Sequence, residues 1–174
     1  MRACLKYLKD KDLKDLTVAE IGVHNGQNAS ELMNELDLSV IYLVDPYVAY
    51  VDKEPEHWFI YDSIMVDSIR AIAESNISLR PDGYKAKFIR MPSLKAMELF
   101  PDNMFDFVYI DALHSHPHVD NDINVWYNKV KTGGVLGGHD WALPDVKEAV
   151  RKFTYDNQIT IDETLFETDW YIQK

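Results

Sequence analysis

Two aspartates stand at the ends of apolar stretches that have the composition of buried strands. Asp111 closes the stretch FDFVYID, and Asp140 follows the stretch GGVLGGH. If these strands are neighbours in a parallel sheet, both carboxylates face one cleft at its carboxyl edge. Carboxylate oxygens suit a hard cation such as Mg²⁺. We therefore predict a divalent cation held by Asp111 and Asp140, although each aspartate could instead cap a helix or a turn.

A histidine lies close to each of these aspartates. His114 follows Asp111 by three residues, and His139 directly precedes Asp140. An imidazole, with an unperturbed pKa of about 6.5, suits a general base, and as a ligand it would favour Mn²⁺, Fe²⁺ or Zn²⁺ over Mg²⁺. His114 is the catalytic base that we favour. His139 is the second candidate, and it could instead be a packed residue that orients Asp140.

A glycine-containing turn precedes these groups in the sequence. The stretch VAEIGVHNGQN begins as a strand and ends as a helix start, with Gly22 and Gly26 between them. Glycine allows close approach to a ligand, and the N–H groups of a helix start bind a charged end. The stretch is not the dinucleotide fingerprint, because His24 replaces its second glycine, and no G-x-x-x-x-G-K-[ST] loop occurs. The turn therefore favours a smaller ligand over a pyrophosphate.

An acid stands at the end of the next apolar stretch, VIYLVDP. This acid, Asp45, lies 19 residues after Gly26. An acid at this place can accept hydrogen bonds from both hydroxyls of a ribose. Together the turn and the acid indicate a nucleoside without its pyrophosphate, a description that S-adenosylmethionine fits. Glycine turns and strand-ending aspartates also occur for purely structural reasons.

Strand-like and helix-like segments alternate along the chain, which favours a single α/β domain (residues 1–174) with a doubly wound, mainly parallel sheet and helices on both faces. We predict an N-terminal helix within residues 1–16 and a lid loop at 46–62, where Trp58 could stack on a substrate. The last stretch, ITIDETLFETDWYIQK, predicts an antiparallel hairpin that turns at Thr168 and Asp169. The remaining strands are expected at 17–23, 40–46, 85–91, 105–111 and 133–141, and the remaining helices at 27–36, 61–75, 92–100, 117–130 and 143–157.

The composition and net charge limit which binding partners and which cellular compartment we expect for this protein. The chain of 174 residues has a formal net charge of −11, which disfavours a nucleic-acid partner because phosphate binding needs a basic surface. Its one cysteine, Cys4, cannot form an internal disulfide. No apolar run approaches the ~18 residues of a membrane span, and the first residues lack the apolar run of a signal peptide. We expect a cytoplasmic protein without a membrane or nucleic-acid partner.

Four motifs resemble those of a known family. EIGVHNG and LVDPY resemble the first two motifs of class I S-adenosylmethionine-dependent methyltransferases, and the resemblance extends over residues 17–174. IDALHSH and GGVLGGHDW are similar to stretches of small-molecule O-methyltransferases that act on sugars and catechols. The resemblance implies a Rossmann-like, seven-stranded sheet whose last strand is antiparallel. It also implies metal ligands at Asp111 and Asp140, and cofactor contacts at Glu20, Gly22, Asn25, Gly26, Asp45, Ser93 and Asp111.

Two departures from the family pattern concern the chemistry. Trp141 stands where the catechol enzymes have an asparagine ligand, so the resemblance does not supply a third metal ligand. Those enzymes also use a lysine near the substrate hydroxyl. In the matching region this chain has Leu113 and His114, so its base would be a histidine.

We therefore expect methyl transfer from S-adenosylmethionine to a hydroxyl of a small molecule, such as a sugar or a phenol, with Mg²⁺ or another divalent cation. One alternative is an S-adenosylmethionine-binding module without chemistry, which would not need the set Asp111, His114 and Asp140. Another is a nicotinamide-dependent oxidoreductase, against which His24 argues. Specificity would depend on loops at the sheet edge or on a partner subunit that closes the cleft, which leaves a homo-oligomer open.

Overall fold

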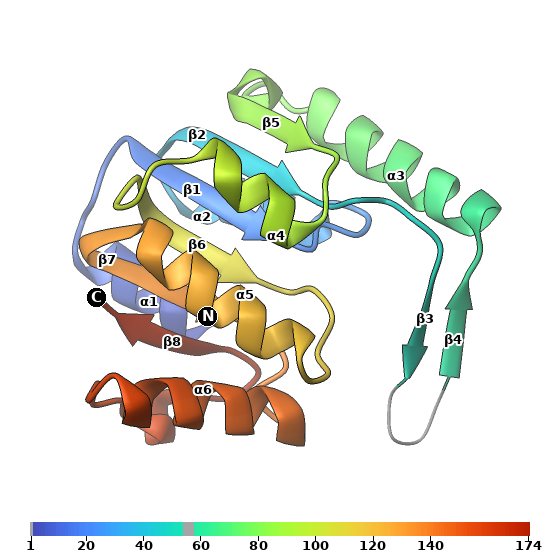
Figure 1. The fold of residues 1–174 in the computed structure, drawn as a ribbon. Coiled ribbons are helices and arrows are strands. Elements are labelled where there is room, and N and C mark those ends of the chain that lie inside the picture. The colour runs from blue at the N-terminus through green and yellow to red at the C-terminus, as the bar shows by residue number, and fades with distance from the viewer. Residues whose placement is uncertain (1, 54–57) are drawn as a thin grey trace.

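The computed structural model describes residues 2–53 and 58–174. Within these residues, a six-stranded main sheet has the strand order β5-β2-β1-β6-β7-β8, as Figure 1 shows. Neighbouring strands run parallel except for β8, which is antiparallel to β7. The strands are β1 (Leu16–Ile21), β2 (Leu38–Val44), β5 (Ala86–Ile89), β6 (Phe105–Ile110), β7 (Val130–Gly138) and β8 (Trp170–Gln173).

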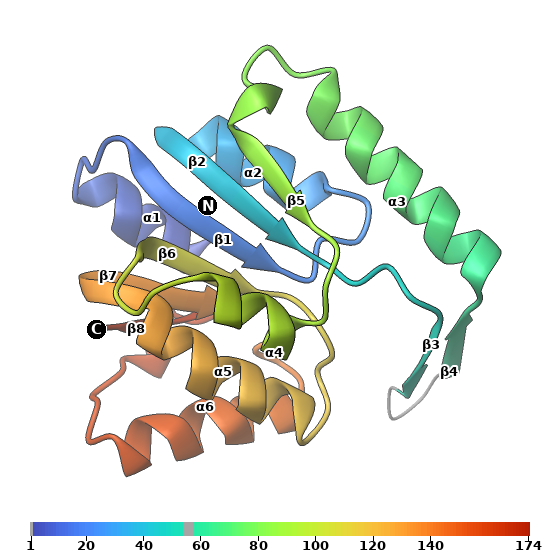
Figure 2. The ribbon, with the colours of Figure 1, turned by 45° about the horizontal axis from the view of Figure 1, so that its top comes forward.

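Helices cover both faces of this sheet. One face packs against α1, α2 and α3, and the other packs against α4, α5 and α6 (Figure 2). The doubly wound α/β fold predicted from the sequence is confirmed. The helices are α1 (Ala3–Asp10), α2 (Gln27–Glu35), α3 (Ser63–Ser78), α4 (Ser93–Ala96), α5 (His118–Lys129) and α6 (Pro144–Asp156), with short 3₁₀ turns η1 (Gly83–Lys85), η2 (Met97–Leu99) and η3 (Glu163–Leu165).

The strand order reverses between β1 and β6. The chain builds outward from β1 through β2 to β5 on one side, and from β6 through β7 to β8 on the other. Ligands of open α/β sheets bind outside the carboxyl ends of the strands at such a reversal. The turn after β1 and Asp111 after β6 stand on its two sides. This topology therefore brings the sequence-predicted residues to one edge.

The antiparallel last strand is confirmed, but among the described residues the main sheet has six strands rather than seven. The expected strand at the start of ITIDETLFETDWYIQK does not form, and β8 pairs with β7 instead. The physical reason is a local turn: the Asp162 carboxylate accepts hydrogen bonds from the backbone N–H and the hydroxyl of Thr164, and η3 follows. Ile159 and Ile161 pack against the core on the α6 side without joining the sheet.

One segment differs from its sequence-based prediction. Residues 46–62, expected to be a lid loop, contain a separate two-stranded antiparallel hairpin, β3 (Tyr50–Lys53) and β4 (Trp58–Tyr61). Figures 1 and 2 show this hairpin projecting from the main sheet beyond the first turn of α3. The Trp58 side chain, proposed to stack on a substrate, lies outside the described part of the chain. The N-terminal helix, expected within residues 1–16, forms at Ala3–Asp10 and ends there, before the backbone becomes left-handed at Asp12.

No helix among residues 2–53 and 58–174 is both long and apolar enough to cross a membrane.

Candidate functional site

The turn after β1 crosses directly over the end of β6. Gly22 has a left-handed φ of +87°, and a Cβ built on it would lie 2.0 Å from the carbonyl oxygen of Asp111. No side chain fits at that distance, so this position needs glycine for both its conformation and its close contact. Gly26 is also left-handed, with a φ of +76°, and it is the N-cap residue that precedes α2. A Cβ on Gly26 would lie 3.2 Å from Ala73 Cα of α3, so α3 closes over this side of the turn.

Asp45, the expected ribose acid, holds this turn in place. Its Oδ2 accepts hydrogen bonds from the backbone N–H groups of Val23 and His24, at 3.0 and 3.1 Å. Its Oδ1 accepts a third, at 2.8 Å, from the N–H of Tyr47. A carboxylate has about four lone-pair sites, so three backbone contacts leave capacity for a ligand hydroxyl. Ribose binding by Asp45 stays a prediction. The structure shows in addition that Asp45 has a structural role, because it anchors the backbone of the turn.

Glu20 is a fully buried acid at the floor of the turn. Its side chain is 0% exposed, and burial raises its pKa to about 8. Asn28 Nδ2 donates a hydrogen bond to Oε1 at 2.9 Å, while Oε2 has no hydrogen-bond partner in the described part of the chain. A buried acceptor without a hydrogen-bond donor costs free energy of folding, and a bound ligand that donates a hydrogen bond would remove this cost. A cationic ligand group placed beside Glu20 would both satisfy Oε2 and favour the ionised form.

Two further candidate cofactor residues have side chains that are already engaged within the protein. Asn25 Oδ1 accepts a hydrogen bond from the backbone N–H of Gln27 at 3.1 Å, in the first turn of α2. The Ser93 hydroxyl donates to the carboxylate of Asp122 and accepts from Trp126 Nε1 at 2.7 Å. Because the Ser93 hydroxyl is engaged, any contact with adenine would be made by the backbone between β5 and α4. This adenine contact stays a prediction.

The acids and histidines predicted from the strand ends do converge. His114 Nε2 lies 2.8 Å from Asp140 Oδ2 and 3.7 Å from Asp111 Oδ1. His139 Nδ1 lies 3.1 Å from Asp140 Oδ1. All four side chains are between 25% and 39% exposed, so they line an accessible edge rather than the core. We call these four residues the acid–histidine cluster.

Asp140 is the centre of the cluster. The two neighbouring imidazoles hold the pKa of Asp140 far below its ordinary value, against the opposing effect of its burial. In return, Asp140 raises the pKa of His139. Asp140 also has a left-handed φ of +60°, a conformation that is uncommon outside glycine and costs free energy. The chain thus keeps Asp140 ionised and aimed at both histidines.

The cluster contains a set of donors that suits a divalent cation. One ligand atom each from Asp111, His139 and Asp140 lies within 4.8 Å of the other two. The sequence predicted the two carboxylates, and the structure adds His139 as the third donor. Two carboxylates and one imidazole are compatible with Mg²⁺, Mn²⁺, Fe²⁺ or Zn²⁺. Trp141, at the position of a ligand in the resembling enzymes, is instead buried against Phe166 and the side chains of α6.

Sequence reasoning missed a buried group beside the cluster. Asp169 is 1% exposed, with Oδ1 4.0 Å from His139 Nε2. Cys4 Sγ donates to its Oδ2 at 3.3 Å, and Arg2 Nε lies 3.4 Å from the same oxygen. Arg2 and Cys4 belong to the start of the chain, so nothing local to Asp169 in the sequence indicates this contact. The group joins α1 to the edge of the sheet that carries the cluster.

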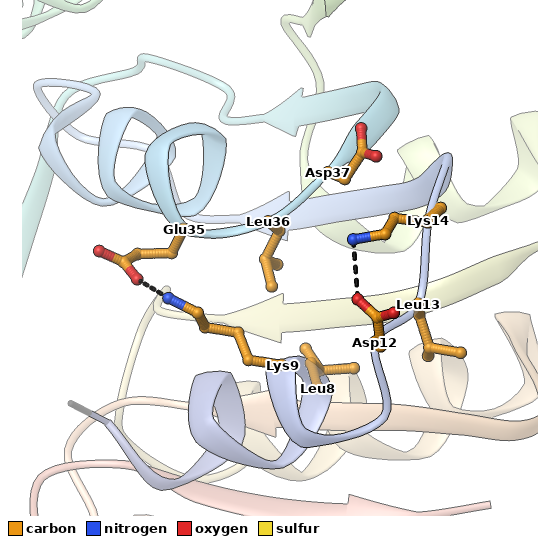
Figure 3. A pocket seen from close by; sticks show the side chains of 8 residues that line it. All are labelled: Leu8, Lys9, Asp12, Leu13, Lys14, Glu35, Leu36 and Asp37. Carbon is orange, nitrogen blue, oxygen red and sulfur yellow. Dashed lines mark hydrogen bonds and ion pairs between the residues drawn. The ribbon is translucent and has the colours of Figure 1, made fainter.

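A separate surface pocket lies away from these residues, as Figure 3 shows. It opens between α1 and the connections that enter β1 and β2, which is the amino edge of these strands. The acid–histidine cluster is at the carboxyl edge, so we assign the pocket no part in the chemistry. Its lining residues are Leu8, Lys9, Asp12, Leu13, Lys14, Glu35, Leu36 and Asp37.

Solved structures with the same fold include enzymes of several activities. The O-methyltransferase NovP is 16% identical with a TM-score of 0.68, over 98% of this chain and 76% of that chain. The precorrin-6y C5,15-methyltransferase of Geobacter metallireducens is also 16% identical, with a TM-score of 0.61 over 89% and 69%. The spermidine synthase of Thermotoga maritima is 16% identical, with a TM-score of 0.57 over 91% and 52%. At these identities the likeness establishes the fold alone.

The family follows from a sequence match rather than from these structures. No curated protein sequence matches the chain. A family model for the methyltransferase domain matches residues 19–141, which include the glycine turn, Asp45 and the whole acid–histidine cluster. The chain belongs to this family and is a class I S-adenosylmethionine-dependent methyltransferase.

Proposed function

We propose that this protein transfers the methyl group of S-adenosylmethionine to a hydroxyl of a small molecule, with a divalent cation at Asp111, His139 and Asp140. The observation that carries the proposal is the acid–histidine cluster, which adjoins the glycine turn at the reversal of strand order. A protein that only binds S-adenosylmethionine has no use for such a cluster. The relative NovP, named an O-methyltransferase, supports a hydroxyl as the acceptor.

Each end of the cofactor has a suitable partner in this site. The orphaned oxygen of Glu20 faces the turn that would hold the amino-acid end, and its negative charge suits an ammonium group. Asp45 would accept the ribose hydroxyls, and the turn that contains Ser93 would border the base. These contacts would fix the sulfonium methyl in line with an acceptor at the carboxyl edge, and orientation of this kind supplies much of the acceleration of a displacement reaction.

The proton of the acceptor hydroxyl would go to His114. Its ring lies beside both Asp111 and Asp140, whose negative charges favour the imidazolium that forms after proton transfer. His139 would act as a ligand rather than as the base, since one of its ring nitrogens is among the three clustered donor atoms. When bound, the cation would lower the pKa of the acceptor hydroxyl and fix its direction.

The test is release of S-adenosylhomocysteine from a panel of catechols, phenols and sugars, with Mg²⁺, with Mn²⁺, and with EDTA. Asp140→Ala and His114→Ala are each expected to lower kcat/KM by about 10²-fold or more. The exposed Asp156 of α6 provides the matched control, and Asp156→Ala should keep full activity. Mn²⁺ titration without substrate should give binding in wild type and in Asp156→Ala but not in Asp140→Ala.

Each part of the proposal can fail separately. Full turnover of Asp140→Ala in EDTA would overturn the cation, and full turnover of His114→Ala would overturn the base. Binding of S-adenosylhomocysteine without turnover on any acceptor would favour the non-catalytic module.

A further inference from the structure

The chain at the start of β8 holds the backbone of the segment that carries His139. The carbonyl oxygen of Thr168 accepts a hydrogen bond from the backbone N–H of Trp141 at 3.0 Å. The indole Nε1 of Trp170 donates a hydrogen bond to the carbonyl oxygen of His139, also at 3.0 Å. Asp169 lies between the two residues that make these contacts. Its position relative to the acid–histidine cluster is therefore fixed by the backbone.

The two carboxylate oxygens of Asp169 have different surroundings. Oδ2 faces the start of α1, where Cys4 Sγ donates to it at 3.3 Å and Arg2 Nε lies 3.4 Å away. Oδ1 accepts a hydrogen bond from the hydroxyl of Thr168 at 3.1 Å and lies 4.0 Å from Nε2 of His139. Each carboxylate oxygen has two lone pairs, so Oδ1 can accept a second hydrogen bond.

The two ring nitrogens of His139 lie beside different acids. Nδ1 is 3.1 Å from Oδ1 of Asp140, whereas Nε2 is the nitrogen next to Asp169. In a neutral imidazole, one nitrogen carries the proton and the other has the lone pair that can bind a cation. A carboxylate only accepts hydrogen bonds, so Asp169 favours the proton on Nε2. The lone pair is then left on Nδ1, on the side of Asp140.

We propose that Asp169 is a positioning residue for the cation site, which holds the ring proton of His139 on Nε2 and leaves Nδ1 to bind the cation. The inference rests on the proposed function, since it needs a cation at the cluster. Histidine ligands commonly donate their second N–H group to a carboxylate that does not touch the metal. The 4.0 Å contact is longer than a hydrogen bond, and a shift of about 1 Å would close it.

Arg2 and Cys4 fix the direction of the Asp169 carboxylate. Both are hydrogen-bond donors beside the same oxygen, and Arg2 adds a positive charge that offsets the cost of burying an acid. Arg2 is itself held in place, because its Nη1 donates to the hydroxyl of Tyr109 at 2.9 Å. With donors on one side, the other oxygen of Asp169 is the one that faces His139. The first residues of the chain thus support the cation site without touching it.

Asp169→Asn keeps the shape of the side chain but reverses its hydrogen bond to His139. Because Arg2 and Cys4 both donate, the amide oxygen would turn toward them and the NH₂ group would face Nε2. Nε2 would then need a lone pair, so the ring proton would move to Nδ1 and block the cation there. We expect Asp169→Asn to bind Mn²⁺ about 10–100-fold more weakly than wild type, with the affinity for S-adenosylhomocysteine nearly unchanged.

The first test is titration of the purified proteins with Mn²⁺, followed by the paramagnetic resonance signal of free Mn²⁺. Asp106→Asn is the matched control. Asp106 is also a poorly exposed acid with two donors, the N–H of Thr17 and Nζ of Lys131, each at 2.8 Å, but it lies near the amino end of β6. This variant should bind Mn²⁺ like wild type. Circular dichroism establishes that each variant is folded.

The second test needs no change at Asp169. Wild-type protein labelled with ¹⁵N-histidine is saturated with Zn²⁺, and NMR identifies which ring nitrogen binds the cation and which carries the proton. The signals of His139 are assigned by their loss in His139→Gln. We expect Zn²⁺ on Nδ1 and the proton on Nε2.

The outcomes separate this inference from the proposed function. Wild-type protein that binds Mn²⁺, together with an Asp169→Asn variant that binds it equally well, would overturn only the role of Asp169. Zn²⁺ on Nε2 of His139 would do the same. Loss of both Mn²⁺ and S-adenosylhomocysteine in Asp169→Asn would show a general structural role and would also overturn the inference. Wild-type protein that binds no cation would overturn the cation of the proposed function, and this inference with it.

Discussion

Replacing Gly22 with alanine is expected to destabilise the protein by about 4 kcal/mol or more, at the upper end of single-substitution effects. The added Cβ would lie 2.0 Å from the Asp111 carbonyl oxygen and 2.5 Å from its carbonyl carbon, and both are backbone atoms that cannot rotate away. Urea denaturation measures the loss. Any folded fraction should bind S-adenosylhomocysteine poorly, because the turn and Asp111 would have moved apart.

Gly133→Ala separates the steric clash from the strain of a left-handed backbone. Gly133 has a φ of +84°, nearly that of Gly22, but a Cβ there would meet nothing within 4 Å. This variant should lose only about 1–2 kcal/mol, the cost of left-handed backbone for a residue with a Cβ. Equal losses for the two variants would contradict the close crossing of the turn over β6.

Glu20→Gln is expected to have two opposite effects, a weaker affinity for the cofactor and a higher stability of the ligand-free protein. A buried charge pair with the cofactor ammonium would be lost, and S-adenosylhomocysteine should bind about 30-fold more weakly or worse, as such losses cost 2 kcal/mol or more. Glutamine keeps the shape and the contact with Asn28 but removes the buried charge. Calorimetric titration measures the first effect, and denaturation as a function of pH measures the second.

The sign of the stability effect follows from the raised pKa. The pKa of Glu20 is about 8 in the folded protein against an ordinary value of 4.5, mainly because of burial, with the charges of Asp111 and Asp45 raising it and Arg2 lowering it. Between about pH 4.5 and pH 8 the folded state keeps a proton that the unfolded chain releases, so wild-type stability falls as the pH rises through this window.

Glu20→Gln should remove this fall, and at pH 8 it should be more stable than wild type by about 4 kcal/mol, the linkage value of a shift from 4.5 to about 8. The exposed Glu167 provides the control, and Glu167→Gln should leave both the pH profile and the affinity nearly unchanged. A Glu20→Gln protein that binds S-adenosylhomocysteine as tightly as wild type would show that Glu20 is only a buried core acid.

The part of the fold and site that the sequence predicts depends on a single geometric rule. Buried parallel strands have long apolar runs, and their carboxyl ends meet at one edge of the sheet, so the sequence alone predicts that Asp111 and Asp140 lie together. His114 follows from its distance of three residues from Asp111. The 2.8 Å contact between His114 and Asp140 is the quantity that confirms this convergence.

The features that the sequence did not predict depend on contacts between segments far apart in the chain, or on two local structures that compete within one segment. Asp169 meets Cys4 across 165 residues of sequence, and no local pattern indicates such a contact. Ser93 is the motif residue expected beside adenine, yet its hydroxyl already donates a hydrogen bond to Asp122 of α5. In the last stretch, alternating apolar residues favoured a strand, but the Asp162 turn is a local alternative to the sheet and it prevails.

The most direct test of the central claim is calorimetric titration of the purified protein with S-adenosylhomocysteine, in wild type, Asp45→Ala and Asp37→Ala. Asp45 holds the turn through two backbone hydrogen bonds, from Val23 and His24, whereas Asp37 is an exposed residue at the opposite edge of the sheet. We predict binding in the micromolar range for wild type and Asp37→Ala, and its loss in Asp45→Ala. A folded wild-type protein that binds no S-adenosylhomocysteine, or an Asp45→Ala variant that binds it normally, would contradict the assignment of the cofactor to this turn.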